Sequence, residues 1–462
     1  MESLGESLIA LLKVFGYSWT MNKERFLIVW IALLTVLSVL GGAWAVAEML
    51  PRELLIIYSG NSLGELKPCG CAKEEDQGGF ERRMTFFKRF AANAENTLFV
   101  DTGDSFKEPT RQGKIKARYI MQAMSRLNYD AVVPGDKDLV YGEAFLEQKK
   151  SIPWLLSNLE MQNFHPARTR IRHLGNGLKV ALLAVADPDL FYSVTHSGAR
   201  VTNPEETVRA LVKNLQESET PDLIVLLTHT KREKALPLLE LEGVDVVING
   251  HMEKETDNID MTPVKKDGKV FVQPGPRGQK IGELKVRIDS VGRKSFDQHM
   301  ARLDSNIKLD PEMIEWYEEY NREVEDLFFA SLEARKNQNT EKRVYATEQA
   351  CETCHSDEHE VWSKSRHSRA YETLSRVNKA FDPECLKCHV TGLDQPGGFI
   401  SEVDTPKLQN VQCEVCHGPG LDHASNPQPG FGENARQACK LCHVKNHSPR
   451  FDFSKYWPKI EH

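Results

Sequence analysis

Four copies of the motif Cys-x-x-Cys-His lie in the last quarter of the chain. They read CETCH, CLKCH, CEVCH and CKLCH, at 351–355, 385–389, 413–417 and 439–443. Two thiols at this spacing can form thioethers with one haem, and the histidine that follows can bind its iron. The pattern therefore predicts four haem c groups, attached through Cys351, Cys354, Cys385, Cys388, Cys413, Cys416, Cys439 and Cys442, with proximal ligands His355, His389, His417 and His443.

Zinc is the alternative, because paired Cys-x-x-Cys units also build structural zinc sites. A zinc site does not require a histidine directly after every second cysteine, and here one follows in all four motifs. Eight of the ten cysteines belong to these motifs. The pattern favours haem over zinc.

The N-terminal part contains a long apolar run, from Phe26 to Ala47. Its length suits either a membrane-spanning helix or an export signal. The small residues before Glu48 resemble a signal-peptidase site, whereas Lys23 and Arg25 before the run would orient an anchor with its N-terminus in the cytoplasm. We therefore expect 26–48 to be a signal peptide or a membrane anchor, and 1–25 to be a cytoplasmic segment or an extension ahead of a start at Met21.

This topology places the rest of the chain in the periplasm or on the outer face of the cytoplasmic membrane, anchored or released. The formal net charge of −7 argues against a nucleic-acid partner. We expect redox proteins as partners, such as membrane-bound quinol-linked complexes or other cytochromes.

Short apolar runs alternate with helical patterns through the first 300 residues. We expect helices over 114–127 and 205–216, and strands over 54–58, 97–101, 131–134, 180–186, 223–229 and 245–250. Such alternation predicts a layered α/β domain, which we place at 52–304. Asp310-Pro311-Glu312 is a helix start, and one or two linker helices are expected over 305–344.

The last segment, 345–462, lacks long apolar runs. A domain of this size without a hydrophobic core is marginal, so haems would have to supply the core. We expect a small, mostly α or irregular multihaem domain.

Several segments of this region resemble the cytochrome c-554 type of tetrahaem cytochrome: WSKSRHSRAYETL, CEVCHGPGLDH and SPRFDFSKYWPKIEH, at 362–374, 413–423 and 448–462. The family's distal-ligand positions fall on His367, His423 and His462. The resemblance implies three six-coordinate haems and one with an open or weakly held sixth position. His359 and His447 are interpreted as surface histidines; if either binds iron, all four haems could have two histidine ligands.

The α/β region resembles the 5′-nucleotidase branch of the calcineurin-like metallophosphatases, which implies an αββα sandwich. The matching segments are VDTGD, VVPGDKD, LLTH, INGHME and PGPRGQKIGEL, at 100–104, 132–138, 226–229, 248–253 and 274–284. Several metal-ligand positions of that family have changed: its Asp-x-His reads Asn61-Ser62-Leu63, its Asn-His-Glu reads Asp136-Lys137-Asp138, and its last histidine is Glu253.

Four ligands of one family metal site remain. We expect at most one metal, Zn, Mn or Fe, held by Asp104, Asp136, His229 and His251. The alternative is an inherited pocket in which these side chains bind only one another. The loss of the catalytic histidine argues against nucleotide hydrolysis.

The two remaining cysteines, Cys69 and Cys71, lie in the segment KPCGC. With GGFERR at 78–83, this segment resembles a nucleotidase-related subgroup in which a Cys pair replaces metal ligands. The thiols could be redox-active and catalytic, could bind the metal, or could form a structural pair.

These observations favour a multihaem cytochrome that carries electrons in a respiratory chain, with a degenerate metallophosphatase-like partner domain. The first alternative is an oxidoreductase that acts on a small nitrogen or sulfur compound, at an open haem or at Cys69 and Cys71. The second is a metal-dependent phosphoesterase.

Overall fold

The computed structural model describes residues 51–68, 76–107, 109–191, 199–252, 259–339, 343–432, 435–445 and 447–462. The predicted signal or anchor at 26–48 and the pair Cys69 and Cys71 lie outside these residues. Within the described part, no helix is both long and apolar enough to cross a membrane. The described residues of 54–286 and 295–462 form one compact unit.

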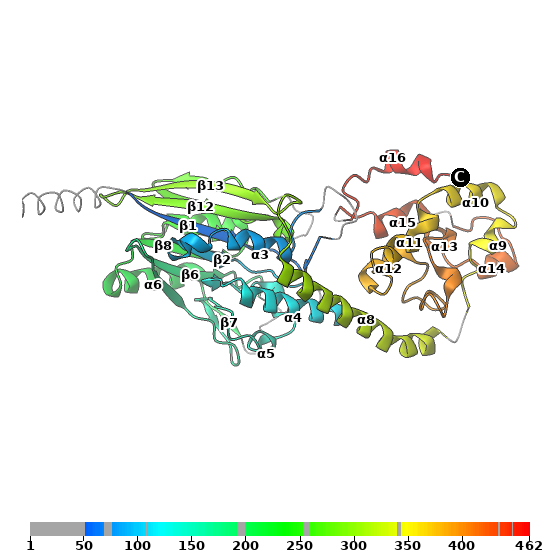
Figure 1. The fold of residues 1–462 in the computed structure, drawn as a ribbon, viewed down its shortest axis with the longest axis horizontal. Helices are drawn as coiled ribbons and strands as arrows, with labels where there is room; N and C mark the ends of the chain where they lie inside the picture. Colours follow the sequence, from blue (N-terminus) through cyan, green and yellow to red (C-terminus); the bar gives the residue numbers. More distant parts are fainter. Residues whose placement is uncertain are drawn as a thin grey trace, which may run out of the picture. The chain divides into compact units, whose positions relative to one another are not determined.

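Two mixed sheets form the α/β part (Figure 1). The first sheet has the order β13-β12-β1-β2-β3, and β2 pairs in parallel with both β1 and β3. Its strands are β1 (Arg52–Ser59), β2 (Thr97–Asp101), β3 (Ala131–Val132), β12 (Lys280–Ile288) and β13 (Lys294–Arg302).

The second sheet has the order β10-β11-β9-β8-β6-β5, with β6, β8, β9 and β11 parallel to one another. Its strands are β5 (Thr169–His173), β6 (Lys179–Ala186), β8 (Leu223–His229), β9 (Val246–Asn249), β10 (Val264–Lys266) and β11 (Lys269–Val272). A separate pair consists of β4 (Leu159–Glu160) and β7 (Arg200–Val201).

The central strands are apolar on both faces because both faces are covered. Every residue of β8 and β9 is buried. The helix α6 (Pro204–Ser218) packs on the second sheet through Val208, Val212 and Leu215, which share a core cluster with side chains of β6, β8 and β9. Its start is fixed by the Asn203 side chain, which accepts a hydrogen bond from the backbone N–H of Glu206.

A single long helix, α8 (Pro311–Asn339), follows β13, the outer strand of the first sheet. Met313, Trp316, Tyr320, Val324 and Phe328 recur every three or four residues and are all buried. This face packs on α3 (Phe80–Lys88) and α4 (Arg111–Arg126), with a Phe80–Trp316 ring contact and a 3.0 Å hydrogen bond from Gln112 to the Tyr320 hydroxyl. The segment predicted as a linker therefore carries a helix that packs against the α/β layers.

Short helices complete this part of the chain. They are α5 (Glu143–Leu146), α7 (Arg232–Ala235) and the 3-10 turns Ala91–Asn96, Asp136–Leu139, Leu236–Glu240 and Pro276–Gly278.

The C-terminal region is helical, and most of its buried apolar residues lie between Ala370 and Val411. Its helices are α9 (Glu348–Glu352), α10 (Ser356–Lys364), α11 (Ala370–Ser375), α12 (Pro383–His389), α13 (Cys413–His417), α14 (Leu421–Ser425), α15 (Ala435–Cys442) and α16 (Phe453–Tyr456), with 3-10 turns at His367–Arg369, Pro406–Leu408 and Trp457–Lys459. No residue of α9, α10, α14, α15 or α16 is buried. These helices do not form an apolar core of their own.

The predicted elements agree closely with the structure. The predicted strands at 97–101 and 223–229 have the observed bounds of β2 and β8, and α4 and α6 cover the predicted helices. The strand predicted over 131–134 is shorter, because β3 ends at Val132 and the chain turns toward Pro134. The metallophosphatase-like α/β fold and the helical C-terminal region are both present.

Candidate metal centre and haem-attachment region

Four side chains at the carboxyl ends of parallel strands meet at one place. Asp104 follows β2, Asp136 follows β3, His229 ends β8 and His251 follows β9. Strands from both sheets thus contribute to the cluster, and their carboxyl ends are where α/β folds place functional sites. One ligand atom from each residue lies within 4.8 Å of the other three.

The contacts within this cluster are short. His229 Nε2 lies 2.9 Å from Asp136 Oδ1 and 3.3 Å from Asp104 Oδ1. His251 Nδ1 lies 3.2 Å from Asp136 Oδ1 and 3.3 Å from His229 Nε2. Ligands at about 2.1 Å from a tetrahedral metal ion lie roughly 3.4 Å from one another. The spacing of these four donors therefore fits a single divalent ion.

The tautomer of His229 supports the same conclusion. Its Nδ1 lies 2.9 Å from the carbonyl oxygen of Thr102, which can only accept, so Nδ1 carries the hydrogen. In a neutral imidazole the Nε2 lone pair then faces the two carboxylates, an arrangement that requires a cation between them. A backbone acceptor on the second ring nitrogen is the usual partner of a metal-binding histidine.

Opposite charges that lie close together shift the pKa values of the residues in this cluster. Burial alone lowers the pKa of His229, but the carboxylates of Asp104 and Asp136 outweigh it and raise the pKa well above its usual range. Burial raises the pKa of Asp136, but hydrogen bonds from His229 and His251 outweigh it and lower the pKa. The pocket thus stabilises positive charge, either a proton on His229 or a metal ion.

The loop that carries Asp104 is held by a second carboxylate. Asp138 Oδ1 accepts from the backbone N–H groups of Ser105 and Phe106 at 2.8 and 3.0 Å, and its Oδ2 accepts from those of Asp104 and Gly135 at 3.0 and 2.8 Å. Asp104 itself has a left-handed backbone, with φ of 57°. Asp138 therefore positions a strained ligand residue and does not itself belong to the cluster.

Gly135 leaves space for Asp104 and His229 to approach each other. A Cβ at this position would lie 2.5 Å from Asp104 Oδ1 and 2.7 Å from His229 Cε1. Its backbone is extended, with φ of −81°, so the requirement for glycine is one of space.

Lys137 belongs to the site. The family resemblance identified this position only as the replacement of a histidine. Its ammonium group lies 2.6 Å from Asp104 Oδ2 and donates to the Met252 carbonyl at 3.1 Å. Burial lowers the pKa of Lys137, but Asp104 and Asp136 outweigh it and raise the pKa. The Asp136-Lys137-Asp138 triplet marks the position in the sequence, but it does not show which acceptors the ammonium group reaches.

The positions of the lost Asp-x-His are buried close to the same loop. The backbone N–H of Asn61 donates to the Gly103 carbonyl, and that of Leu63 donates to the Asp104 carbonyl. The Leu63 side chain is buried and apolar, and neither polar atom of the buried Asn61 side chain has a hydrogen-bond partner among the described residues. Ser62 is held by Arg83 at 3.0 Å.

In the C-terminal region the four motifs lie at or within α9, α12, α13 and α15. Three proximal histidines each face one of the expected distal histidines. The ring centroids are 6.4 Å apart for His355 and His423, 5.7 Å for His417 and His462, and 6.0 Å for His443 and His367. Imidazoles on opposite sides of one iron, each with its nitrogen at about 2 Å, have centroids roughly 6 Å apart. The three pairs therefore fit three haems with two histidine ligands.

The fourth proximal histidine differs. His389 Nδ1 lies 2.7 Å from the Ala370 carbonyl and 3.2 Å from the Thr373 hydroxyl. Within the described residues, no histidine ring faces it as in the other three pairs. The arrangement fits a haem with one histidine ligand at this motif.

The two remaining histidines have intermediate exposure, and their interpretation as surface histidines stays a prediction. His359 Nε2 is bound to Glu348 at 2.7 Å, and its Nδ1 lies 3.5 Å from Glu352. Among the described residues, His447 Nδ1 has no hydrogen-bond partner. Burial, and then the nearby Lys387, lower the pKa of His447.

Backbone and hydroxyl groups orient other ligand rings. His417 Nδ1 lies 3.3 Å from the Gly432 carbonyl, and His443 Nδ1 lies 3.1 Å from the Ser448 hydroxyl. Burial lowers the pKa of His367, His417 and His443, which favours the neutral imidazole that binds iron.

Helices that carry different motifs also lie in contact. The helix α9 contacts α13, and α12 contacts α15. These contacts bring the first motif beside the third and the second beside the fourth.

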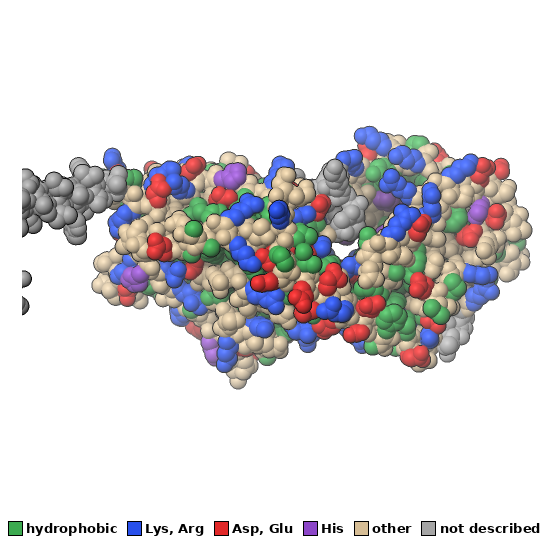
Figure 2. Space-filling view, in the orientation of Figure 1, with side chains coloured by type: hydrophobic (Ala, Val, Ile, Leu, Met, Phe, Trp, Pro, Cys, Tyr) green, Lys and Arg blue, Asp and Glu red, His purple; other side chains and the backbone are tan. Residues whose placement is uncertain are grey.

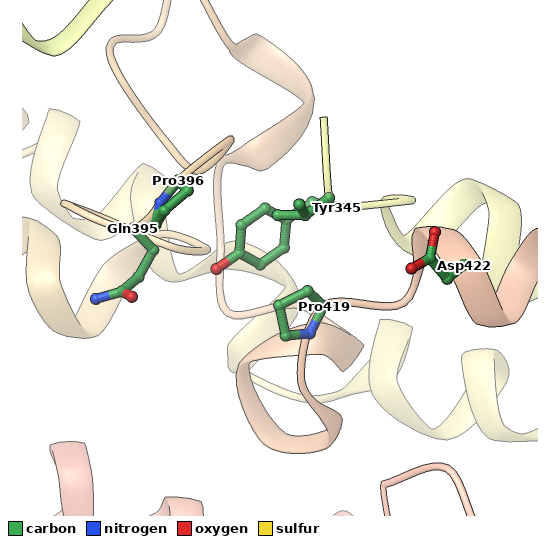
Figure 3. A pocket seen from close by; sticks show the side chains of 6 residues that line it. Tyr345, Gln395, Pro396, Pro419 and Asp422 are labelled. Atoms are coloured by element: carbon green, nitrogen blue, oxygen red, sulfur yellow. The ribbon is translucent and has the colours of Figure 1, made fainter. Parts of the chain in front are cut away.

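A cavity of about 330 Å³ also lies in the C-terminal region and is lined by Val344, Tyr345, Gln395, Pro396, Pro419 and Asp422 (Figure 3). The Tyr345 ring projects between Gln395 and Pro419. None of the lining residues is a cysteine or histidine, although Asp422 directly precedes His423.

Comparison with known proteins separates the two regions. Residues 350–418 match the family model described as cytochrome c554 and c-prime. This range contains the first three motifs and ends before the fourth. Cytochrome c-554 of Nitrosomonas europaea is 34% identical over 97 residues, which cover 17% of this chain and 41% of that protein.

The α/β region matches phosphoesterases. The trifunctional nucleotide phosphoesterase YfkN of Bacillus subtilis is 21% identical over 289 residues, which cover 53% of this chain and 20% of that protein. The structure of a 5′-nucleotidase precursor from Thermus thermophilus superposes with a TM-score of 0.51 at 21% identity and covers 59% of each chain. The chain thus spans about a fifth to three fifths of these relatives. It joins a region similar to 5′-nucleotidases and calcineurin-like phosphoesterases to a region similar to cytochrome c-554.

Proposed function

We propose that this protein is a tetrahaem electron carrier of a respiratory chain, in which the phosphoesterase-like domain serves as a partner domain with one divalent metal ion. The similarity to cytochrome c-554 supports a multihaem electron-carrier role. The fourth haem rests on the motif at 439–443, which has the same spacing as the others.

The observation that carries this proposal is the set of three facing histidine pairs, with centroids 5.7–6.4 Å apart. Each pair joins a histidine from a haem-attachment motif to one distant in sequence. Hydrogen bonds on Nδ1 orient His417 and His443 so that Nε2 is free to bind iron. Bound haem supplies one-electron redox chemistry, and two strong histidine ligands suit transfer without binding of a small molecule.

The contacts between motifs suggest a path for electrons. Contacts of α9 with α13, of α13 with α15 and of α15 with α12 bring neighbouring attachment sites together in the order first, third, fourth, second. Haems held at these sites would lie next to one another, as one-electron transfer along a chain requires.

The second motif also contacts the α/β part. Lys116 of α4 binds Glu384 at 2.6 Å, and Gln112 of α4 donates to Asp382 at 2.9 Å. Glu384 directly precedes Cys385. This contact supports a role for the α/β domain at the end of the haem series.

For location we propose the periplasm or the outer face of the cytoplasmic membrane, because haem c attachment and the apolar segment 26–48 both suit export. The proposed partners are membrane-bound quinol-linked complexes or other cytochromes. The acidic net charge of −7 suits partners with basic docking surfaces. Acidic and basic side chains alternate over the face shown in Figure 2, so recognition would rest on local patches.

The test is a haem count combined with a redox titration on protein matured in a host that attaches haem c. Pyridine haemochrome and intact mass should give four haems per chain, and optical titration should show reversible one-electron steps. Zinc in place of covalent haem would refute the proposal.

A second candidate function follows from His389. A haem without a distal histidine can bind a small molecule, so oxidoreductase activity toward a nitrogen or sulfur compound is the alternative. Phosphoester hydrolysis has less support, because Lys137 stands where the family has its catalytic histidine. A divalent ion at Asp104, Asp136, His229 and His251 would supply Lewis-acid chemistry.

A further inference from the structure

We propose that the ammonium group of Lys137 takes the place of one metal ion of a two-metal site, so that the α/β domain binds a single divalent ion beside a fixed positive charge. This inference concerns the α/β domain and does not depend on the electron-carrier role.

The two oxygens of the Asp104 carboxylate have different partners. Its Oδ1 faces His229 Nε2 at 3.3 Å, inside the four-ligand cluster. Its Oδ2 binds Lys137 Nζ at 2.6 Å. A carboxylate shared by two metal ions that lie about 3.5–4 Å apart also gives one oxygen to each ion. The ammonium therefore occupies the side of Asp104 that a second ion would otherwise use.

Lys137 has a fixed position. Its ammonium also donates to the Met252 carbonyl at 3.1 Å, and its backbone N–H donates to Asp104 Oδ1 at 3.3 Å. The side chain is 26% exposed, whereas Asp104 is fully buried. Lys137 is held both at its ammonium group and at its backbone. Its charge lies in a largely buried site, so salt screens it less than a surface charge.

The residues at the lost ligand positions offer few atoms that could bind a second metal ion. Leu63 offers no ligand atom and is buried, and its backbone N–H is bonded to the Asp104 carbonyl. The Asn61 amide is a weaker ligand than the carboxylate or imidazole that a divalent transition metal prefers. Of the two carboxylates in the four-ligand cluster, Asp104 lies nearer to the ammonium group, at 2.6 Å, and Asp136 Oδ2 lies 4.0 Å from it.

A consequence follows for metal affinity. A positive charge close to a divalent ion repels it, and it also competes for the Asp104 carboxylate. Removal of the charge at constant side-chain volume, by Lys137→Met, should tighten binding of the single ion by about tenfold or more. Lys137→Arg should keep wild-type affinity, because it keeps the charge.

The experiment uses the haem-loaded full chain with Mn²⁺ as the probe. Equilibrium dialysis gives the stoichiometry and affinity, and EPR distinguishes an isolated Mn²⁺ from a coupled pair. Lys266→Met, which removes an exposed lysine of the same domain, is the matched control and should not change binding.

We expect one isolated Mn²⁺ per chain in the wild type and in every variant, with tighter binding only in Lys137→Met. Two ions per wild-type chain, or no ion at all, would overturn the inference. So would an affinity of Lys137→Met that is weaker than wild type or within about twofold of it. If Lys137→Met does not fold, the wild-type stoichiometry and Lys137→Arg still decide.

Discussion

His229 directs its Nε2 atom at Asp136 Oδ1 across 2.9 Å, while its other nitrogen is held by the Thr102 carbonyl at 2.9 Å. The end of β8 and the turn after β3 are thereby joined, although 93 residues separate the two side chains in sequence. Two histidines and two carboxylates that converge in this way need a cation. The predictions on the α/β domain test whether that cation is a metal ion.

Substitution of Asp136 by asparagine should weaken metal binding by about 10–100-fold, because one anionic donor is lost from a set of four. Elemental analysis of haem-loaded protein, with iron discounted for haem, measures the effect. Asp189→Asn, at an exposed carboxylate of the same domain, is the control. Equal metal content in both variants would argue that the four residues bind only one another.

Substitution of Gly135 by alanine should remove the metal and lower the free energy of unfolding by about 1–3 kcal/mol, because the added methyl group meets Asp104 and His229. Gly142→Ala is the control. Unlike Gly135, that residue has no described atom within 4 Å of an added Cβ, but its φ is 81°, so only a backbone cost of about 1 kcal/mol is expected. Chemical denaturation and metal analysis should separate the two variants, and retention of the metal in Gly135→Ala would contradict the geometry.

Substitution of His423 by alanine should convert one low-spin haem to high spin, since His423 faces His355. His359→Ala should leave the haem spectrum unchanged, because His359 is bound to Glu348 and Glu352. EPR on the oxidised proteins measures both. A new high-spin haem in His359→Ala, or none in His423→Ala, would show that the ligand pairs are wrongly assigned.

Protein made without haem should lose structure in 345–462 and keep the α/β domain. The helices α9, α10, α14, α15 and α16 have no buried residue of their own, whereas β8 and β9 are buried throughout. Limited proteolysis with mass analysis should give a protected fragment that ends near α8. Equal protection of both regions without haem would show that the C-terminal region folds by itself.

The sequence was sufficient to predict the elements that bury apolar side chains. The strands β2 and β8 are short apolar runs bounded by polar residues, and the predicted residues 97–101 and 223–229 are the observed ones. The long helix was ambiguous because its charged surface resembles a linker. The row of Met313, Trp316, Tyr320 and their neighbours, which packs against the α/β layers, could be recognised only with the partner helices in place.

The candidate site was predictable where a family pattern fixed residue positions. Asp104, Asp136, His229 and His251 come together as expected. The role of Lys137 was not predictable, because a side chain with four methylene groups can reach many acceptors. Only the fold decides that it reaches Asp104 and the Met252 carbonyl.

The most direct test of the proposed function is EPR and optical spectroscopy on the oxidised, haem-loaded protein, with and without cyanide. We expect four haems. Three should be low-spin and unaffected by cyanide, and the one attached at Cys385 and Cys388 should be high-spin and bind cyanide. His447→Ala should leave this pattern unchanged. A count below four haems, or four low-spin haems that ignore cyanide, would contradict the account.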